Sequence, residues 1–210
     1  MAKKYLLAAA AGLLMSAAAA NAAPILTPPS GLNAVGDVTA VYIFADAGDT
    51  SILNELTPSA IAQIFCNHPT GGCAGNVAGN QVDLGVQNGA MTFSLANVTT
   101  GSTFTSNTPE TVGGPYHVLV STNYSDFGVG ALLPGAQSAI NALLAAGKSI
   151  TYVGWEDLSA AQGSDFDYND LIFAFAGTQI ITVPEPVTVS LFGAGLAGAA
   201  WMRRRKSKKA

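Results

Sequence analysis

The strongest constraint on this fold is an apolar run near the C-terminus, residues 187–202, which ends at a cluster of cations. As a helix these 16 residues rise about 24 Å, somewhat less than the ~30 Å hydrocarbon core of a bilayer. Trp201 and the arginines after it reach the interfacial region and make up the difference. Because the cationic end of such an anchor stays in the cytoplasm, the sequence predicts a transmembrane helix with the preceding chain outside. The alternative is a buried C-terminal helix with a basic tail.

The N-terminus is a second segment that does not join the fold. Two lysines within the first four residues are followed by an apolar stretch at 6–20 and by Ala-Asn-Ala at 20–22. This order is that of a secretory signal peptide with its helical apolar region, and we place the cut after Ala22. The alternative is an uncleaved N-terminal anchor. We therefore assign residues 1–22 to targeting and expect the protein to work outside the cytoplasm.

A Pro-Glu-Pro motif, the apolar run and an arginine cluster follow one another at the C-terminus. Together they resemble the PEP-CTERM sorting signal of Gram-negative bacteria, over residues 183–206. Proteins with this signal are processed by exosortase, a membrane protease or transpeptidase. The resemblance implies exosortase as a partner, an inner-membrane-anchored precursor, and a final place at the cell surface or in the extracellular matrix. The residues that carry the resemblance are Val183, Pro184, Glu185, Pro186, Arg203, Arg204 and Arg205.

Between the two targeting segments lies a strongly acidic body, residues 23–182, whose length of about 160 residues fits one domain. The whole chain carries a net charge of −4, but eight of its nine Lys and Arg residues lie in the targeting segments. The body holds one base, Lys148, against 12 acidic residues, so its net charge is −11. Such a surface repels nucleic acid and anionic lipid, and it suits a protein that binds cations or sits in a hydrated matrix. The alternative is that the charge serves solubility alone.

The body is predicted to be mainly β. Residues 38–45 and 171–176 are rich in β-branched and aromatic side chains, which favour strands. Apolar residues at helical spacing predict one helix at 134–147 and two short helical turns at 51–65. Short strands between turn residues are typical of a β-sandwich, here jelly-roll-like with one or two short helices. The further expected strands are 81–86, 90–97, 103–105, 116–122 and 149–154.

Two cysteines, Cys66 and Cys73, flank a glycine-rich loop. In an exported chain with an even cysteine count, a disulfide between them is expected. The alternative takes Cys66, His68 and Cys73 as metal ligands, but a fourth ligand at a zinc-site spacing is missing.

Five carboxylates and one amide gather within 15 residues near the end of the body, without a cation nearby in sequence. Like charges at such density repel, and Ca²⁺ offsets this repulsion because it binds six to eight oxygen ligands. Alternate residues from Asp165 match the first half of an EF-hand loop, but Asp170 stands where glycine is required. The alternative is an exposed acidic turn. The predicted calcium ligands are Asp165, Asp167, Asn169, Asp170, Glu156 and Asp157.

The same residues carry a second resemblance. Gly-Trp-Glu-Asp-Leu from Gly154, a short spacer, and Asp-Phe-Asp-Tyr-Asn-Asp from Asp165 are similar to the hallmark of the domain of unknown function 4114. The similarity covers residues 81–176. It implies a calcium-stabilised extracellular domain, with no activity attached to the family.

The sequence predicts no enzyme. His68 and His117 have no serine or cysteine partner in a recognisable catalytic setting, and His117 lies in a predicted strand. We expect an exported, non-catalytic, calcium-binding protein of the exopolysaccharide or biofilm matrix. One alternative is a carbohydrate-active enzyme that uses a pair of acids such as Asp157 and Asp165. Another is a structural surface protein without metal.

Overall fold

The computed structural model describes residues 23–181. The predicted signal helix, the sorting motif from Val183 and the transmembrane helix at 187–202 all lie outside the described residues. Within residues 23–181, no helix combines the length and the apolar character that a membrane crossing requires.

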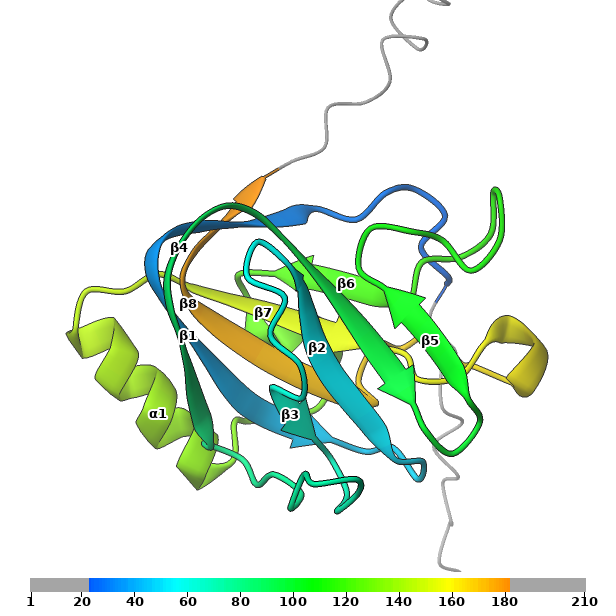
Figure 1. Ribbon diagram of the computed structural model, residues 1–210, viewed down its shortest axis with the longest axis horizontal. Coiled ribbons are helices and arrows are strands. Elements are labelled where there is room, and N and C mark those ends of the chain that lie inside the picture. The colour runs from blue at the N-terminus through cyan, green and yellow to red at the C-terminus, as the bar shows by residue number, and fades with distance from the viewer. Residues whose placement is uncertain (1–22, 182–210) are drawn as a thin grey trace, which may run out of the picture.

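The described body is an antiparallel sheet with one α-helix against it (Figure 1). The sheet order is β3-β2-β4-β1-β8-β7-β6, and β5 pairs with β4. The predicted mainly β class is confirmed. The strands are β1 (Gly31–Ala45), β2 (Ser51–Thr57), β3 (Phe65–Cys66), β4 (Gln81–Asn97), β5 (Ser102–Thr105), β6 (Val118–Ser121), β7 (Ile150–Trp155) and β8 (Leu171–Ile181). The helices are α1 (Pro134–Ala145) and two 3₁₀ turns, η1 (Tyr124–Phe127) and η2 (Ala160–Gln162).

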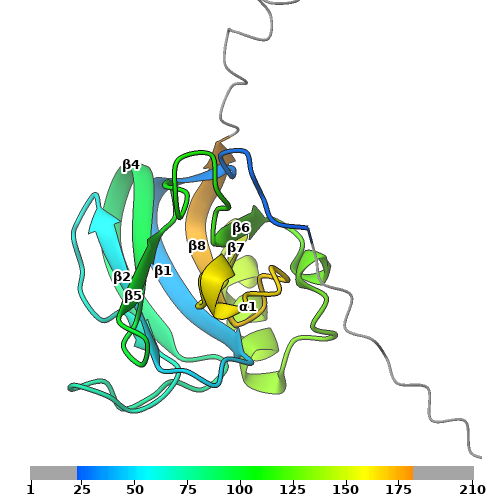
Figure 2. The ribbon, with the colours of Figure 1, turned by 90° about the vertical axis from the view of Figure 1, so that its right-hand side faces the viewer.

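The long strand β4 joins the two halves of the sheet. Its first part pairs with β1, from Val41–Gln81 to Leu32–Met91, and its second part pairs with β2 and β5. The β2-β4-β5 half turns back over the β1-β8-β7-β6 half (Figure 2). The sequence predicted a jelly-roll-like sandwich, but the described strands form one open antiparallel sheet bent over itself instead of two separate sheets.

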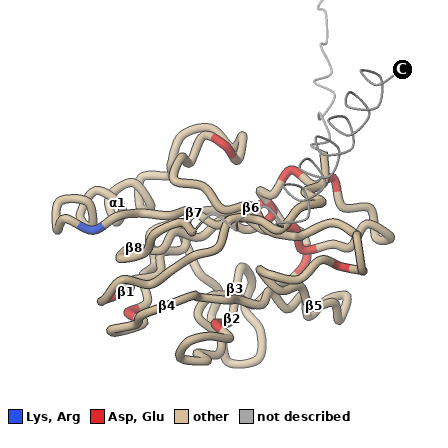
Figure 3. Tube along the Cα trace, turned by 90° about the horizontal axis from the view of Figure 1, so that it is seen from above, with Lys and Arg blue, Asp and Glu red and all other residues tan. Residues whose placement is uncertain are grey.

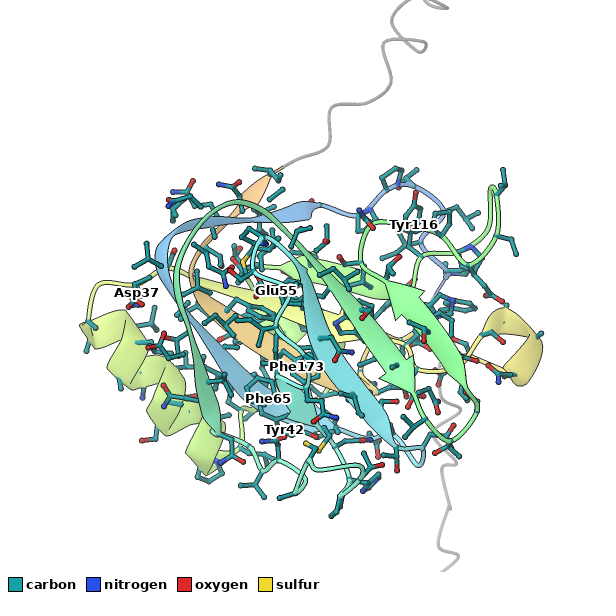
Figure 4. The ribbon with its side chains drawn as sticks, in the orientation of Figure 1. Asp37, Tyr42, Glu55, Phe65, Tyr116 and Phe173 are labelled. Carbon is teal, nitrogen blue, oxygen red and sulfur yellow. A yellow bond between two sulfur atoms is a disulfide. The ribbon has the colours of Figure 1, made fainter. Side chains whose placement is uncertain are left out.

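Aromatic side chains fill the space between the two halves. The rings of Phe93 on β4 and Phe175 on β8 lie 4.6 Å apart between centroids. Phe65 stacks on Phe173 at 5.7 Å, and Tyr42 meets both of these rings edge-on (Figure 4). Aromatic pairs in these geometries stabilise a core beyond the area that they bury.

The predicted helix is found as α1, on the opposite face of β1, β7 and β8. It buries Ala136, Ala139, Ile140 and Leu143, the spacing that one face of a helix presents. Residues 171–176 of β8 are buried on both faces, because one face meets the aromatic core and the other meets α1. This burial explains why the strand is apolar throughout its first six residues rather than alternating.

The prediction of helical turns at 51–65 is wrong. Residues Ser51–Thr57 form β2, which pairs with β4, and Phe65–Cys66 form β3, which pairs with β2. Ser51, Leu53 and Glu55 alternate toward the interior with the period of a strand. A disulfide joins Cys66 at the end of β3 to Cys73, with their Cα atoms 6.2 Å apart. It occupies both sulfurs, so the alternative of thiolate metal ligands does not apply to this structure.

Candidate metal centre

The acidic residues lie in the loop that connects two paired strands. Trp155 at the end of β7 pairs with Leu171 at the start of β8, so residues 156–170 form one loop closed at its base. The turn after β1 lies against this loop, since the Asp46 N–H donates to the Asp170 carbonyl over 3.0 Å. Figure 3 shows a group of Asp and Glu positions at the end of the body away from α1, with others spread over the rest of the body. The one cation of residues 23–181, Lys148, follows α1 and pairs with Asp37.

Glu156 anchors the acidic loop from inside. Its side chain is fully buried, and its carboxylate accepts hydrogen bonds from the Ser164 hydroxyl and from the backbone N–H groups of Phe166 and Tyr168. Phe166 and Tyr168 have φ angles of +55° and +59°, in the left-handed region. Left-handed residues that alternate with right-handed ones turn successive N–H groups toward one anion. The carboxylate therefore stabilises a backbone shape that bulky residues rarely adopt.

Three carboxylates converge at this loop. One oxygen from each of Glu156, Asp165 and Asp167 lies within 4.8 Å of the others. Asp165 and Asp167 are half-buried, so the group opens toward solvent on their side. Asn169 completes the group, because its side-chain amide donates to the second oxygen of Asp167 over 2.6 Å. Its own carbonyl oxygen stays available as a further ligand.

Burial without a counter-charge shifts the acid–base equilibria of this group. Desolvation raises the pKa of the Glu156 carboxyl, and the charges of Asp165 and Asp167 raise it further. Desolvation is also the largest cause of the raised pKa of Asp167. Both shifts mean that the ionised forms are disfavoured, as like charges at short range require. A divalent cation would reverse this preference, because carboxylate oxygens are the ligands that hard cations take.

Asp157 and Asp170 form a neighbouring pair that faces inward. The Asp157 N–H donates to the Asp170 carboxylate over 2.9 Å, and the Asp157 carboxylate accepts from the Ser51 hydroxyl over 3.1 Å. Burial, with added repulsion from Glu156 and other nearby acids, raises the pKa of Asp170 to about 8. In the absence of a cation, this shift favours the protonated form of Asp170. Asp157 and Asp170 are predicted ligands that lie outside the group of three converging carboxylates. They are connected to that group by the loop backbone, and the charges of Glu156 and Asp167 act on Asp170.

Two acids outside the predicted set belong to the same end of the molecule. The side-chain amide of Asn97 donates to the Asp49 carboxylate over 2.9 Å and to the Asp157 carbonyl over 2.8 Å. The charge of Asp49 raises the pKa of Asp157, after the larger effect of burial. Asp46 acts in the same direction on Asp167. In the sequence, Asp46 and Asp49 are only two acids in the turn after a predicted strand. The pairing of β1 with β8 brings them close to residues 156–170.

A histidine braces the outer side of the loop. His117 is buried, its ring stacks on Phe104 at 3.8 Å, and its Nε2 lies 3.2 Å from the Glu110 carboxylate. Desolvation lowers the pKa of His117, which favours the neutral ring, although the hydrogen bond and charge of Glu110 act in the opposite direction. Glu110 also accepts from the N–H of Ala160, inside the acidic loop. This histidine is thus held by packing and a carboxylate, and it has no nucleophile as a partner among these contacts. His68 lies at the turn after β1, with its Nε2 3.2 Å from the Ala47 carbonyl.

The fold and the site define a mainly β body with a cluster of acidic residues that could hold a metal ion. Comparison with known proteins adds the sorting class: the PEP-CTERM protein-sorting motif matches residues 182–206. The motif supports an exported protein sorted by exosortase, and it implies a membrane-anchored precursor in a Gram-negative bacterium. No curated protein and no solved structure matches the chain. The resemblance to the domain of unknown function 4114 is not shown by these comparisons and stays a prediction.

Proposed function

We propose that this protein is a non-catalytic component of the cell surface or extracellular matrix whose β body binds Ca²⁺ through residues 156–170. The observation that carries the proposal is the convergence of Glu156, Asp165 and Asp167 in a body with a single, distant cation. Three carboxylates held this close without a counter-charge repel one another. An exported protein meets Ca²⁺ outside the cell, so the ion is available to offset the repulsion.

Asp165 and Asp167 are the principal ligands in this proposal, because their carboxylates converge on the solvent-facing side of the loop. The Asn169 carbonyl and the remaining lone pair of Glu156 add oxygen ligands, and water completes the shell. Asp170 and Asp157 lie behind the ligands and do not bind the ion directly in this proposal. A bound ion lowers the pKa of Asp170 and allows its carboxyl to ionise. Calcium fits this set better than zinc, which prefers nitrogen and sulfur ligands.

The matrix role follows from the sorting motif together with the charge of the body. An acidic body with a cation site suits a hydrated anionic polysaccharide, where Ca²⁺ bridges carboxylates from both partners. The resemblance of residues 81–176 to the domain of unknown function 4114 supports the same proposal. Exopolysaccharide is the proposed partner.

Melting of the exported protein with and without Ca²⁺ tests the proposal. A ligand that binds only the folded state stabilises it by about 2.7 kcal/mol at a hundredfold excess over Kd, or roughly 5–10 °C in Tm for a domain of this size. Asp165→Asn and Asp167→Asn should remove most of the shift. Asp83→Asn is the matched control, because Asp83 is exposed on β4 and outside the acidic group. A chelator-treated sample whose Tm does not respond to millimolar Ca²⁺ would overturn the proposal.

A further inference from the structure

The segment before β1 crosses the molecule to reach the acidic loop. This leader, residues 23–30, forms an isolated antiparallel bridge between Ile25 and Tyr116. The Tyr116 N–H donates to the Ile25 carbonyl over 2.8 Å, and the Ile25 N–H donates to the phenol oxygen of Tyr168 over 2.8 Å. Figure 4 shows Tyr116 beside the leader, at the rim of the body. Tyr168 lies 143 residues after Ile25, between two of the proposed ligands.

Tyr168 is held at both of its ends. Its side chain is buried, and its phenol hydroxyl donates to the Tyr116 carbonyl over 3.2 Å while accepting from Ile25. Its backbone N–H donates to Glu156, the anchor of the loop. Its carbonyl oxygen packs against Gly154, where a Cβ atom would lie only 2.2 Å away. The leader therefore holds the phenol of Tyr168, whose backbone N–H is already bonded to the Glu156 carboxylate in the site.

We propose that the leader is a strap that positions the acidic loop for cation binding. Tyr168 is the positioning residue, and the hydrogen bond from the Ile25 N–H to its phenol oxygen holds it in place. The inference rests on the proposed calcium function. Asp167 and Asn169 flank Tyr168 directly, so the left-handed φ of +59° at Tyr168 sets the directions of both ligands. A strap that holds the phenol restricts this backbone torsion to the shape that brings the carboxylates together.

Coupling between the strap and the ion is reciprocal. If docking of the strap on Tyr168 strengthens Ca²⁺ binding by some factor, bound Ca²⁺ strengthens docking of the strap by the same factor. The loss of one intramolecular hydrogen bond at a partly solvated site corresponds to a roughly two- to tenfold change in an equilibrium constant. Removal of the strap should therefore weaken Ca²⁺ binding by this factor. Ca²⁺ in turn should slow hydrogen exchange of the Ile25 amide by a similar factor.

The test uses two variants and one control in the processed, exported protein. Tyr168→Phe removes the acceptor for Ile25 and keeps the ring, and Ile25→Pro removes the N–H donor. Tyr152→Phe is the control, because Tyr152 is also a buried tyrosine on β7, packed on Tyr124 at 5.5 Å between centroids. Each protein is titrated with CaCl₂, and exchange at residue 25 is followed with and without the ion in the proteins that retain this amide. We expect both strap variants to bind Ca²⁺ two- to tenfold more weakly, and Tyr168→Phe to lose the Ca²⁺-dependent slowing of exchange.

The outcomes separate the strap from the proposed function. If the wild-type protein binds Ca²⁺ and both strap variants bind it equally well, the strap is overturned and the calcium site stands. If the wild-type protein binds no Ca²⁺, the proposed function fails and the strap fails with it. Should Tyr168→Phe not fold, Ile25→Pro decides alone, because it changes only the leader. A Tyr152→Phe protein with the same loss as Tyr168→Phe would also overturn the inference, since the effect would then be general to buried tyrosines.

Discussion

Replacing Gly154 with alanine tests how closely the acidic loop packs on β7. A Cβ atom at this position would lie 2.2 Å from the Tyr168 carbonyl oxygen and 2.5 Å from Cε1 of the buried Phe127 ring. One neighbour is backbone and the other a rigid ring, so the loop must move away from the strand. Overpacking costs about 1–3 kcal/mol, and two such contacts place Gly154→Ala near the upper end, at about 3 kcal/mol. For a domain of this size we expect Tm to fall by roughly 6–12 °C.

Gly48→Ala is the matched control for this experiment. Gly48 has open space where its Cβ would stand, with no atom within 4 Å apart from those of its own chain neighbours. We expect its effect on the free energy of unfolding to stay within about 0.5 kcal/mol. Both variants are melted in chelator, so that cation binding does not enter the comparison. Equal melting temperatures for the two variants would contradict this expectation, because they would show that the loop lifts from β7 without cost.

Three further predictions concern pH, the disulfide and sorting. The pKa of Asp170 is raised from 3.8 to about 8, so between these values the folded state retains a proton that the unfolded chain releases. The free energy of unfolding of the cation-free protein should therefore fall as pH rises from about 4 to about 8. A flat or rising profile in chelator would contradict this. Replacing Cys66 and Cys73 with serine should lower the free energy of unfolding by about 2–3 kcal/mol, measured in denaturant, since the bond closes a short loop; an unchanged midpoint would count against it. Replacing Pro184, Glu185 and Pro186 with alanine should leave a membrane-retained precursor, and normal release at the mature mass would show that the motif is not the recognition signal.

Local sequence predicted the elements whose composition suits only one structure. Val38 to Ala45 and the first residues of β8 carry β-branched and aromatic side chains, and both are strands. Ile140 and Leu143 share a helical face with small residues around them, and α1 forms there. The segment from Ser51 was misassigned because its apolar residues fit a short helix and a strand equally well. Pairing with β4, which is distant in sequence, decides between the two.

The candidate site was predicted in part for a similar reason. Glu156, Asp165 and Asp167 lie close in sequence, and the loop brings them together. The inward pair of Asp157 and Asp170 follows from how the loop base joins β7 to β8, which the acidic pattern alone does not encode. Nor does it encode the approach of the β1–β2 turn, which depends on the pairing of β1 with β8, or that of the leader, which depends on a hydrogen bond from Ile25 to Tyr168. Long-range register, more than local composition, sets the electrostatics of this end of the molecule.

The most direct test of the calcium account is a calorimetric titration of Ca²⁺ into the exported protein after removal of bound cations by chelator. We expect saturable binding of about one ion per chain, lost in the Asp165→Asn/Asp167→Asn double variant and retained in Asp83→Asn. Absence of binding at millimolar Ca²⁺, or equal binding by the double variant, would contradict it. The acidic loop would then hold no metal ion, and protonation would accommodate its buried carboxyls.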